Sequence, residues 1–192
     1  MVFSDKCLAF LNSVYDLGGS CESQFKEKLH FTMAKKNDIL LEVGELCDKL
    51  WFLNKGLTRG FYLHGNKEIT SWFAVENQFF YAADSFLNEK PTSERIQVIE
   101  PVEMVYIYKR DLYELYDEHP SLNHAARIFA ERYRLLNHER LINIRMHTAK
   151  ERLELFAKNH RSLFLRVPQK HIASHIGISE GYVSELLGRF KV

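Results

Sequence analysis

Residues 168–190 read PQKHIASHIGISEGYVSELLGRF, and the interpretation of the whole chain starts from this stretch. Pro168 suits the first turn of a helix, Gly177 suits a left-handed turn, and Ser179 suits the cap of a following helix. Apolar residues at helical spacing flank the turn at Ile172, Ala173, Ile176, Ile178, Val183, Leu186 and Leu187. Two short helices around such a turn predict a helix-turn-helix, whose second helix enters the major groove of DNA. A helical hairpin that serves only packing is the alternative.

The outward positions of this motif supply candidate DNA contacts. We expect nearby basic side chains to hold phosphates, and residues near the start of the second helix to reach base edges. The candidates are Arg166, Gln169, Lys170, Ser179, Glu180, Gly181, Tyr182, Ser184, Glu185 and Arg189, with Lys191 as a further phosphate contact. Glu180 and Glu185 repel phosphates, and the middle of the second helix has no arginine to pair with guanine. The sequence therefore predicts low affinity or an unusual sequence preference.

The distribution of charge agrees with a polyanion-binding C-terminal part. The 192 residues carry a net charge of +1, but residues 121–192 hold 13 Lys/Arg against 6 Asp/Glu. The remainder of the chain holds 13 Lys/Arg against 19 Asp/Glu. A basic segment of this kind indicates nucleic-acid binding, although solvated helix faces produce the same pattern. With no apolar run long enough for a membrane span and no signal-peptide pattern at the N-terminus, we expect a cytoplasmic protein with no membrane partner.

Residues 31–108 have the texture of a β-rich domain. Short aromatic and β-branched runs at 39–41, 50–53, 57–63, 68–73, 95–99 and 103–108 alternate with turn residues. His64-Gly65-Asn66-Lys67 reads as a hairpin turn, and Pro101 is expected to separate the last two strands. Many short strands at this spacing predict a β-barrel or jelly roll. Helices interrupted at residues 18–20 are expected to precede it.

Helical periodicity dominates residues 111–160. A short helix is expected around 112–116, and a long one is expected to start with Ser121 as its N-cap, since neither Pro nor Gly recurs before Pro168. Ile128, Leu135 and Ile142 repeat every seven residues beside a second apolar face. This pattern favours a homodimer through residues 121–146, with packing inside one chain as the alternative. A further helix is expected at 149–158, and any wing strands would have to lie near 163–167.

Cofactor and catalytic signatures are missing from the sequence. Cys7, Cys21 and Cys47 are expected to be reduced and mostly buried, and three thiols are too few for an iron–sulfur cluster. His171 and His175 lie four residues apart, but without a third ligand we expect them to face the surface or a phosphate rather than a metal. No nucleophile–base pair or phosphate-binding loop occurs at a meaningful spacing. We therefore expect no cofactor, no metal and no enzymatic activity.

The order of these parts resembles the Crp/Fnr family of catabolite-activator-like regulators, and is most similar to divergent members found in Bacteroidetes. The resemblance rests on residues 35–44, 50–60, 83–87 and 107–115 and on the helix-turn-helix from Val167 onward. It implies an α+β fold: a cyclic-nucleotide-binding-type double-stranded β-helix, a long dimerisation helix and a C-terminal winged helix-turn-helix. The expected domains are 1–118, 119–146 and 147–192. The implied function is that of a DNA-binding transcription regulator with an unknown small-molecule effector, and RNA polymerase is a further partner that such a regulator admits.

The resemblance does not extend to the cyclic AMP contacts. Family members that bind cyclic AMP place a Gly-Glu pair and, further on, an Arg-Ser pair around the ribose and the cyclic phosphate, where an anion needs an arginine fork. Those positions fall on Tyr81-Ala82 and Thr92-Ser93, so only the serine is kept; a slip of the register would bring Glu89 or Arg95 there instead. The full set of effector-pocket candidates is Tyr81, Ala82, Ala83, Thr92, Ser93, Asn137 and His138. We expect no tight cyclic AMP binding. The alternative function is a ligand-sensing or protein-interaction module with a degenerate helix-turn-helix.

Overall fold

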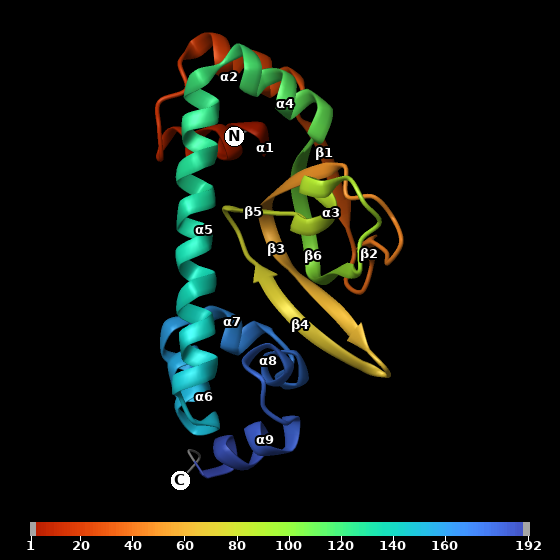
Figure 1. Ribbon diagram of the computed structural model, residues 1–192, viewed down its shortest axis with the longest axis vertical. Coiled ribbons are helices and arrows are strands. Elements are labelled where there is room, and N and C mark those ends of the chain that lie inside the picture. The colour runs from red at the N-terminus through yellow and green to blue at the C-terminus, as the bar shows by residue number, and fades with distance from the viewer. Residues whose placement is uncertain (1–2, 190–192) are drawn as a thin grey trace. The chain divides into compact units, whose positions relative to one another are not determined.

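The computed structural model describes residues 3–189, with side chains described up to Leu186, and it divides into two compact units. The first unit comprises the residues up to Phe61 together with Phe73–Glu131; the second comprises Tyr62–Trp72 together with the residues from Arg132 onward. The long helix α5 (Pro120–Met146) and the hairpin of β3 (Lys49–His64) and β4 (Lys67–Ala74) each contribute to both units (Figure 1). The three-part division with boundaries after residues 118 and 146 stays a prediction.

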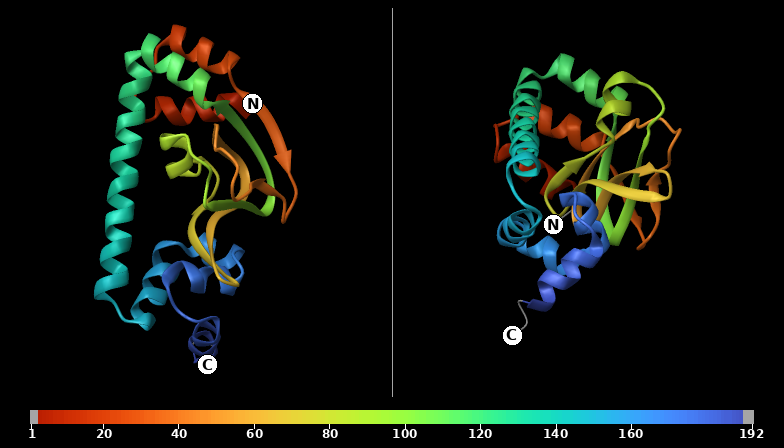
Figure 2. Two further views of the ribbon diagram at one scale, coloured as in Figure 1. Left: turned by 45° about the vertical axis from the view of Figure 1, so that its right-hand side comes forward. Right: turned by 60° about the horizontal axis from the view of Figure 1, so that its bottom comes forward.

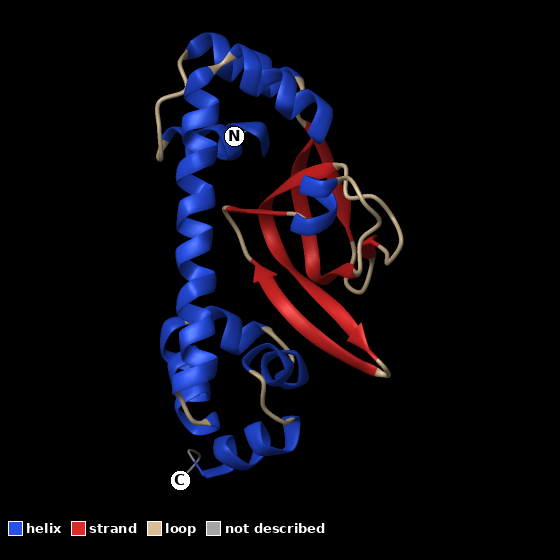
Figure 3. Ribbon diagram, viewed as in Figure 1, coloured by secondary structure: helices blue, strands red, loops and turns tan. Residues whose placement is uncertain are grey.

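A six-stranded sheet organises the β-rich part of the chain (Figure 3). Its order is β1-β6-β3-β4, with β2 paired to β6 and β5 paired to β3. The elements of this part, besides β3 and β4, are α1 (Phe3–Asn12), α2 (Gly19–Glu27), β1 (His30–Ala34), β2 (Ile39–Leu41), β5 (Gln78–Phe80), α3 (Ala83–Asn88), β6 (Glu94–Tyr108) and α4 (Lys109–Glu118). The antiparallel pairs β1–β6 and β3–β5 start at His30↔Tyr106 and Trp51↔Phe80. The expected jelly-roll-type fold is confirmed. The helices are interrupted at residues 13–18 rather than 18–20, because α2 already includes Gly19 and Ser20.

Two predicted strand breaks are wrong. Residues 49–64 form one strand instead of two, and β6 continues through Pro101. The pairing of β2 with β6 involves Ile96 and Gln97, whereas the pairing of β1 with β6 ends at Val102. Pro101 therefore lies between the two pairings on this edge of β6, while the other edge of β6 is paired with β3. On the opposite side, Gly56 of β3 has φ +99°, and a Cβ built there would lie 2.3 Å from the Pro101 carbonyl oxygen.

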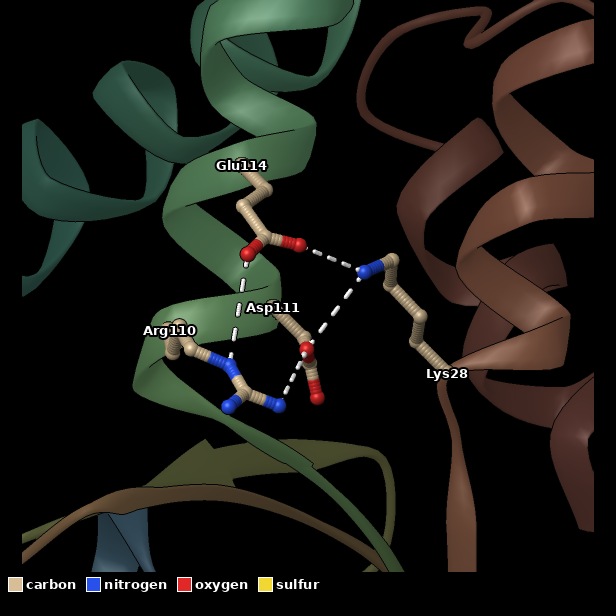
Figure 4. A network of polar contacts seen from close by, with 4 residues as sticks. All are labelled: Lys28, Arg110, Asp111 and Glu114. Carbon is tan, nitrogen blue, oxygen red and sulfur yellow. Dashed lines mark hydrogen bonds and ion pairs between the residues drawn. The ribbon is translucent and has the colours of Figure 1, made fainter.

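The helices of the first unit pack through an aromatic cluster and an ion-pair network. The ring of Phe10 in α1 lies 5.3 Å from that of Phe129 in α5 and 6.0 Å from that of Phe79. Lys28, directly after α2, donates from Nζ to Glu114 at 2.8 Å and to Asp111 at 3.4 Å in α4 (Figure 4). All three cysteines are buried and free, as predicted. Among the described residues, no helix has both the length and the apolar character needed to cross a bilayer.

From Lys109 onward, all regular elements of the described chain are helices, joined by short connections. Beyond α5 it contains α6 (Ala149–Asn159), α7 (Arg161–Arg166), α8 (Gln169–Ile176) and α9 (Glu180–Arg189) (Figure 2). Ser121 does not cap α5, which starts one residue earlier; its hydroxyl donates to the Leu17 carbonyl instead. Thr148 caps α6 in a reciprocal capping box with Glu151. Because residues 161–166 are helical, the segment expected to hold wing strands holds none.

Two arginines fix the end of α8. Arg140 of α5 donates from Nη2 to the His175 carbonyl at 3.1 Å and from Nη1 to the Ser71 carbonyl in the hairpin. Arg152 of α6 donates from Nη1 to the Ile176 carbonyl at 2.8 Å. The last carbonyls of a helix lack partners within the helix and carry partial negative charge, so cationic donors stabilise them. The end of α8 is thereby tied to α5, to α6 and to the hairpin.

The expectation that His171 and His175 face the surface or a phosphate is wrong. His171 is buried, and the ring of His175 packs edge-on against Phe156, with centroids 5.8 Å apart. Burial lowers the pKa of His175 to about 3, and the nearby charges of Arg140 and His160 act in the same direction, against hydrogen bonds to the backbone of Thr70 and Ser71. The two side chains are therefore part of the packing of α8.

We predict that Gly56→Ala destabilises the first unit by about 2–5 kcal/mol, because it combines a positive φ with a clash against backbone. Two alanine substitutions separate these effects. Gly44 has φ +92° and no neighbour within 4 Å, so its replacement should show the conformational cost alone. Gly19 is helical and open, so its replacement should change stability little. Urea unfolding of the three variants tests this order, and equal stability of the Gly56 and Gly19 variants would contradict it.

We predict that protonation destabilises the second unit through His175. Below its ordinary pKa of 6.5, this residue binds a proton in the unfolded chain but stays neutral in the folded chain down to about pH 3. Stability should therefore fall as the pH drops from about 6.5, by at most ~1.4 kcal/mol per pH unit. The free energy of unfolding, measured from pH 7 to pH 5, should depend less on pH in His175→Gln than in the wild-type chain. His138→Gln, at an exposed position of α5, is the control; equal slopes in both variants would contradict this assignment.

Candidate nucleic-acid interface

Helices α8 and α9 form the turn that the sequence predicts. Gly177 adopts the left-handed conformation, with φ 71° and ψ 42°, directly after α8. The Ser179 hydroxyl accepts a hydrogen bond from the Tyr182 N–H at 3.2 Å, which caps α9. The apolar face between the helices is buried at Ile172, Ala173, Ile176, Val183 and Leu186. Ile178 is half-buried, and the Leu187 side chain lies outside the described residues.

The candidate base-reading positions share one open face. Ser179, Glu180, Gly181, Ser184 and Glu185 are exposed, and Tyr182 is half-buried. The Ser184 hydroxyl donates to Oε1 of Gln169 at 3.2 Å, which links the start of α8 to the middle of α9. This link leaves the Gln169 amide nitrogen available as a donor. The face therefore offers hydroxyl groups, an amide and two carboxylates, a set that favours amino-group donors of bases over phosphates.

The basic residues of the second unit fall into two groups. Arg140 and Arg152 are engaged with the end of α8, as described above. Exposed cations remain in the hairpin at Lys67, on α5 at Arg132, Arg134 and Arg145, and on the following helices at Lys150, Lys158, Arg161 and Lys170, and Arg166 is half-buried. The Arg189 side chain and Lys191 lie outside the described part of the chain. The surface charge available to phosphates is therefore smaller than the sequence suggests.

The effector-pocket candidates are divided between the two units. Tyr81, Ala82 and Ala83 lie at the start of α3, and Thr92 and Ser93 directly precede β6, all in the first unit. Asn137 and His138 are exposed on α5, in the second unit.

Thr92, at the position that the sequence resemblance assigns to a phosphate-binding arginine, is buried. The Thr92 hydroxyl accepts from the Glu94 N–H at 2.9 Å and donates to the Glu94 carbonyl at 3.0 Å, so it is satisfied by its own turn. Ser93 is exposed, and Ala82 supplies no carboxylate for a ribose. The structure therefore offers no arginine fork at these positions.

Buried polar side chains of the β-rich domain were missed in the sequence. Arg59 is 1% exposed; it donates to Gln97 from Nε at 3.0 Å and from Nη2 at 2.7 Å, and its guanidinium lies 4.1 Å from the Phe61 ring centroid. Glu94 is 4% exposed. Arg59 stands between Leu57 and Phe61 inside a run predicted to be a strand, and this position is the signal that would have identified it. Arg95, the alternative cation, is paired with Glu42, and this hydrogen bond lowers the pKa of the Glu42 carboxyl.

Surface hollows of the first unit form away from these residues. One, of about 490 Å³, lies between α1 and α2 beside Asp5, Asn12 and Lys26; another, of about 410 Å³, lies beside Leu41, Leu46 and Trp51. Neither is lined by any effector-pocket candidate. Within residues 3–189, no group of three His, Cys, Asp or Glu side chains is arranged to hold a metal ion.

Comparison with known proteins supports a family assignment for the β-rich domain. Residues 32–119 match the cyclic nucleotide-binding domain family. No curated protein matches the chain in sequence.

Solved structures share the fold over most of the chain. FixK2 from Bradyrhizobium japonicum is 14% identical, with a TM-score of 0.71 over 84% of this chain and 83% of its own. The c-di-GMP-responsive regulator CLP of Xanthomonas campestris is 13% identical, with a TM-score of 0.70 over 90% and 91%. A protein assigned to the Crp/Fnr family from Eubacterium rectale is 17% identical, with a TM-score of 0.70 over 92% and 84%. In its fold the chain is therefore Crp/Fnr-like, with a cyclic nucleotide-binding-type domain, which confirms the resemblance predicted from the sequence.

Proposed function

We propose that the chain is a DNA-binding transcription regulator that acts as a homodimer. The observation that carries this proposal is the helix-turn-helix of α8 and α9, with its apolar face buried and positions 180, 181, 184 and 185 exposed. A motif used only for packing would bury both faces of its second helix. The fold shared with FixK2 and CLP supports the same function. RNA polymerase is a further proposed partner, as for other regulators of transcription.

Residues 121–146 are the proposed dimer interface. Large apolar side chains along α5 are exposed by 42–63%: Tyr133, Leu135, Leu136, Leu141, Ile142 and Ile144. These side chains are spread around the helix, and Leu135 and Ile142, seven residues apart, share one face of it. Exposed apolar surface of this extent is unfavourable in water and favours pairing of the helix with a second copy. Pairing would also place two recognition helices on successive turns of a palindromic site.

The effector that we propose for the β-rich domain is neutral or cationic rather than a cyclic nucleotide. Asn54 and Thr58 of β3 are 3% and 0% exposed, and their side-chain polar atoms have no hydrogen-bond partner among the described residues. Buried groups of this kind need a partner, which a polar ligand or water supplies. The buried Glu94 carboxyl lies two residues from Thr92, where a phosphate would need positive charge instead.

A degenerate helix-turn-helix in a sensing or protein-interaction module is the second candidate. The exposed carboxylates of Glu180 and Glu185 favour it, because they repel the DNA backbone. It predicts that no duplex binds.

We predict that the full chain binds duplex DNA in a strongly salt-dependent manner, with two chains per duplex. Fluorescence anisotropy on a pool of random and upstream-region duplexes tests this. For about two to six phosphate contacts, affinity should fall by about ten- to thousandfold between roughly 50 and 200 mM salt. The absence of binding to every duplex at low salt would refute the proposed function.

Replacement of one carboxylate separates the two candidates. Glu185→Arg should raise affinity by about tenfold or more if α9 enters the groove, because it removes a repelled charge and supplies a phosphate or guanine contact. Glu154→Arg makes the same charge change on an exposed position of α6 and is the matched control. Equal gains from both substitutions would show non-specific attraction and would argue against recognition by α9.

We predict that isothermal titration of the full chain with cyclic AMP gives a Kd weaker than about 100 μM. The reason is the loss of the arginine fork at Thr92 together with the engagement of Arg95 by Glu42. Micromolar or tighter binding would contradict this expectation.

A further inference from the structure

The tip of the β3–β4 hairpin, residues 62–72, packs against the first helix of the helix-turn-helix within the second unit. The Ser174 hydroxyl of α8 accepts from the Thr70 N–H at 3.1 Å and donates to the Thr70 hydroxyl at 2.9 Å. Thr70 is fully buried in this contact. The bonds join residues 104 positions apart in the chain, so they are tertiary contacts rather than a consequence of local turn geometry.

Arg140 adds α5 to this contact. Its guanidinium donates both to the Ser71 carbonyl in the hairpin tip and to the His175 carbonyl at the end of α8. His175 also hydrogen-bonds the backbone of Thr70 and Ser71. The hairpin tip is therefore held by Ser174 and His175 of α8 and by Arg140 of α5.

The docked tip leaves the reading face open. Its contacts are with Ser174 and His175 in the second half of α8, whereas Gln169 and Lys170 at the start of α8 stay exposed. The outward positions of α9 are exposed as well. The tip therefore acts on the placement of the helices and does not compete with DNA for them.

We propose that the hairpin tip is a positioning brace for the helix-turn-helix: docked on Ser174 and Arg140 it fixes α8, and with it α9, and its release weakens DNA binding. This inference rests on the proposed function, because its output is DNA affinity. A preformed arrangement binds more tightly than one that must be ordered on binding. Strands β3 and β4 contribute to both units, so a change in these strands within the β-rich domain reaches the tip through continuous backbone. An effector that displaces the tip would thereby lower DNA affinity.

A reversible cross-link tests the brace. In Thr70→Cys/Ser174→Cys, the sulfur atoms replace two hydroxyl oxygens that lie 2.9 Å apart, so a small side-chain shift brings them to the roughly 2.05 Å of a disulfide bond. The reduced variant loses both hydrogen bonds and should bind DNA about three- to tenfold more weakly than the wild-type chain. The oxidised variant should recover affinity to within about twofold. Controls are Thr70→Cys alone and the wild-type chain, with its three buried thiols, under the same oxidant.

Amide hydrogen exchange gives a readout that needs no DNA. Exchange across residues 169–186 should be faster in the reduced variant and return to the wild-type rate on oxidation. Ser174→Ala removes the two bonds to Thr70 without a cross-link, together with the bond from the Ser174 hydroxyl to the His171 carbonyl within α8, and should show the same fast exchange and weaker binding. Ser162→Ala, at an exposed position of α7, is its control and should change neither.

The outcomes separate the brace from the proposed function. Tighter DNA binding by the reduced than by the oxidised form would overturn the brace, as would equal affinity of the two forms. If the wild-type chain binds no duplex, the proposed function fails, and exchange alone then decides: unchanged exchange in α9 on reduction overturns the brace, and faster exchange supports it.

Discussion

The hydrogen bonds of the half-buried Arg140 guanidinium hold three elements of the second unit together. They join α5, the carbonyl of Ser71 in the hairpin tip and the carbonyl of His175 at the end of α8. Removing the guanidinium from water is unfavourable, and burial accordingly lowers the pKa of Arg140. Two carbonyls compensate, one of them at the negative end of a helix dipole, where a charged donor stabilises most. Because Gly177 and α9 follow directly in the chain, this bond helps to fix the point from which α9 starts.

The hydrogen bonds of Arg140 also change the interpretation of the positive charge in the C-terminal segment. Residues 121–192 carry seven more Lys/Arg than Asp/Glu, and the sequence assigns that excess to a polyanion. Arg140 and Arg152 instead bind carbonyls of α8, so part of the positive charge is structural. The negative charges of Glu180 and Glu185, which are exposed on α9, partly offset the positive charge that remains exposed. The attraction of this segment to a polyanion is therefore weaker than its net charge implies.

Sequence patterns predicted features that are encoded locally. The left-handed Gly177, the Ser179 cap, β2 at 39–41 and the turn at 64–67 each follow from residues within a few positions of one another. The incorrect predictions concern features set by distant segments. The strand β6 continues through Pro101 because it is paired with β3 as well as with β1 and β2. His171 is buried, and His175 packs against Phe156 of α6, so neither histidine is an open surface residue. Of the candidate site, the sequence identified the exposed positions of α9 but not Arg140, Thr70 or Ser174, whose contacts span 35–104 positions.

The β-rich domain keeps the scaffold of the cyclic nucleotide-binding domain without an arginine at the positions that the sequence resemblance assigns to the cyclic phosphate. The match over residues 32–119 and the shared fold persist although no arginine fork is left for a cyclic phosphate. A scaffold of this kind depends on backbone constraints such as the approach of Gly56 to Pro101, which are independent of the ligand. The polar residues buried inside it include Arg59, Asn54, Thr58 and Glu94. The first three lie on β3, which continues into the hairpin whose β4 residue Thr70 contacts Ser174 of α8. Under the proposed function, this hairpin connects an effector bound in the β-rich domain to the helix-turn-helix.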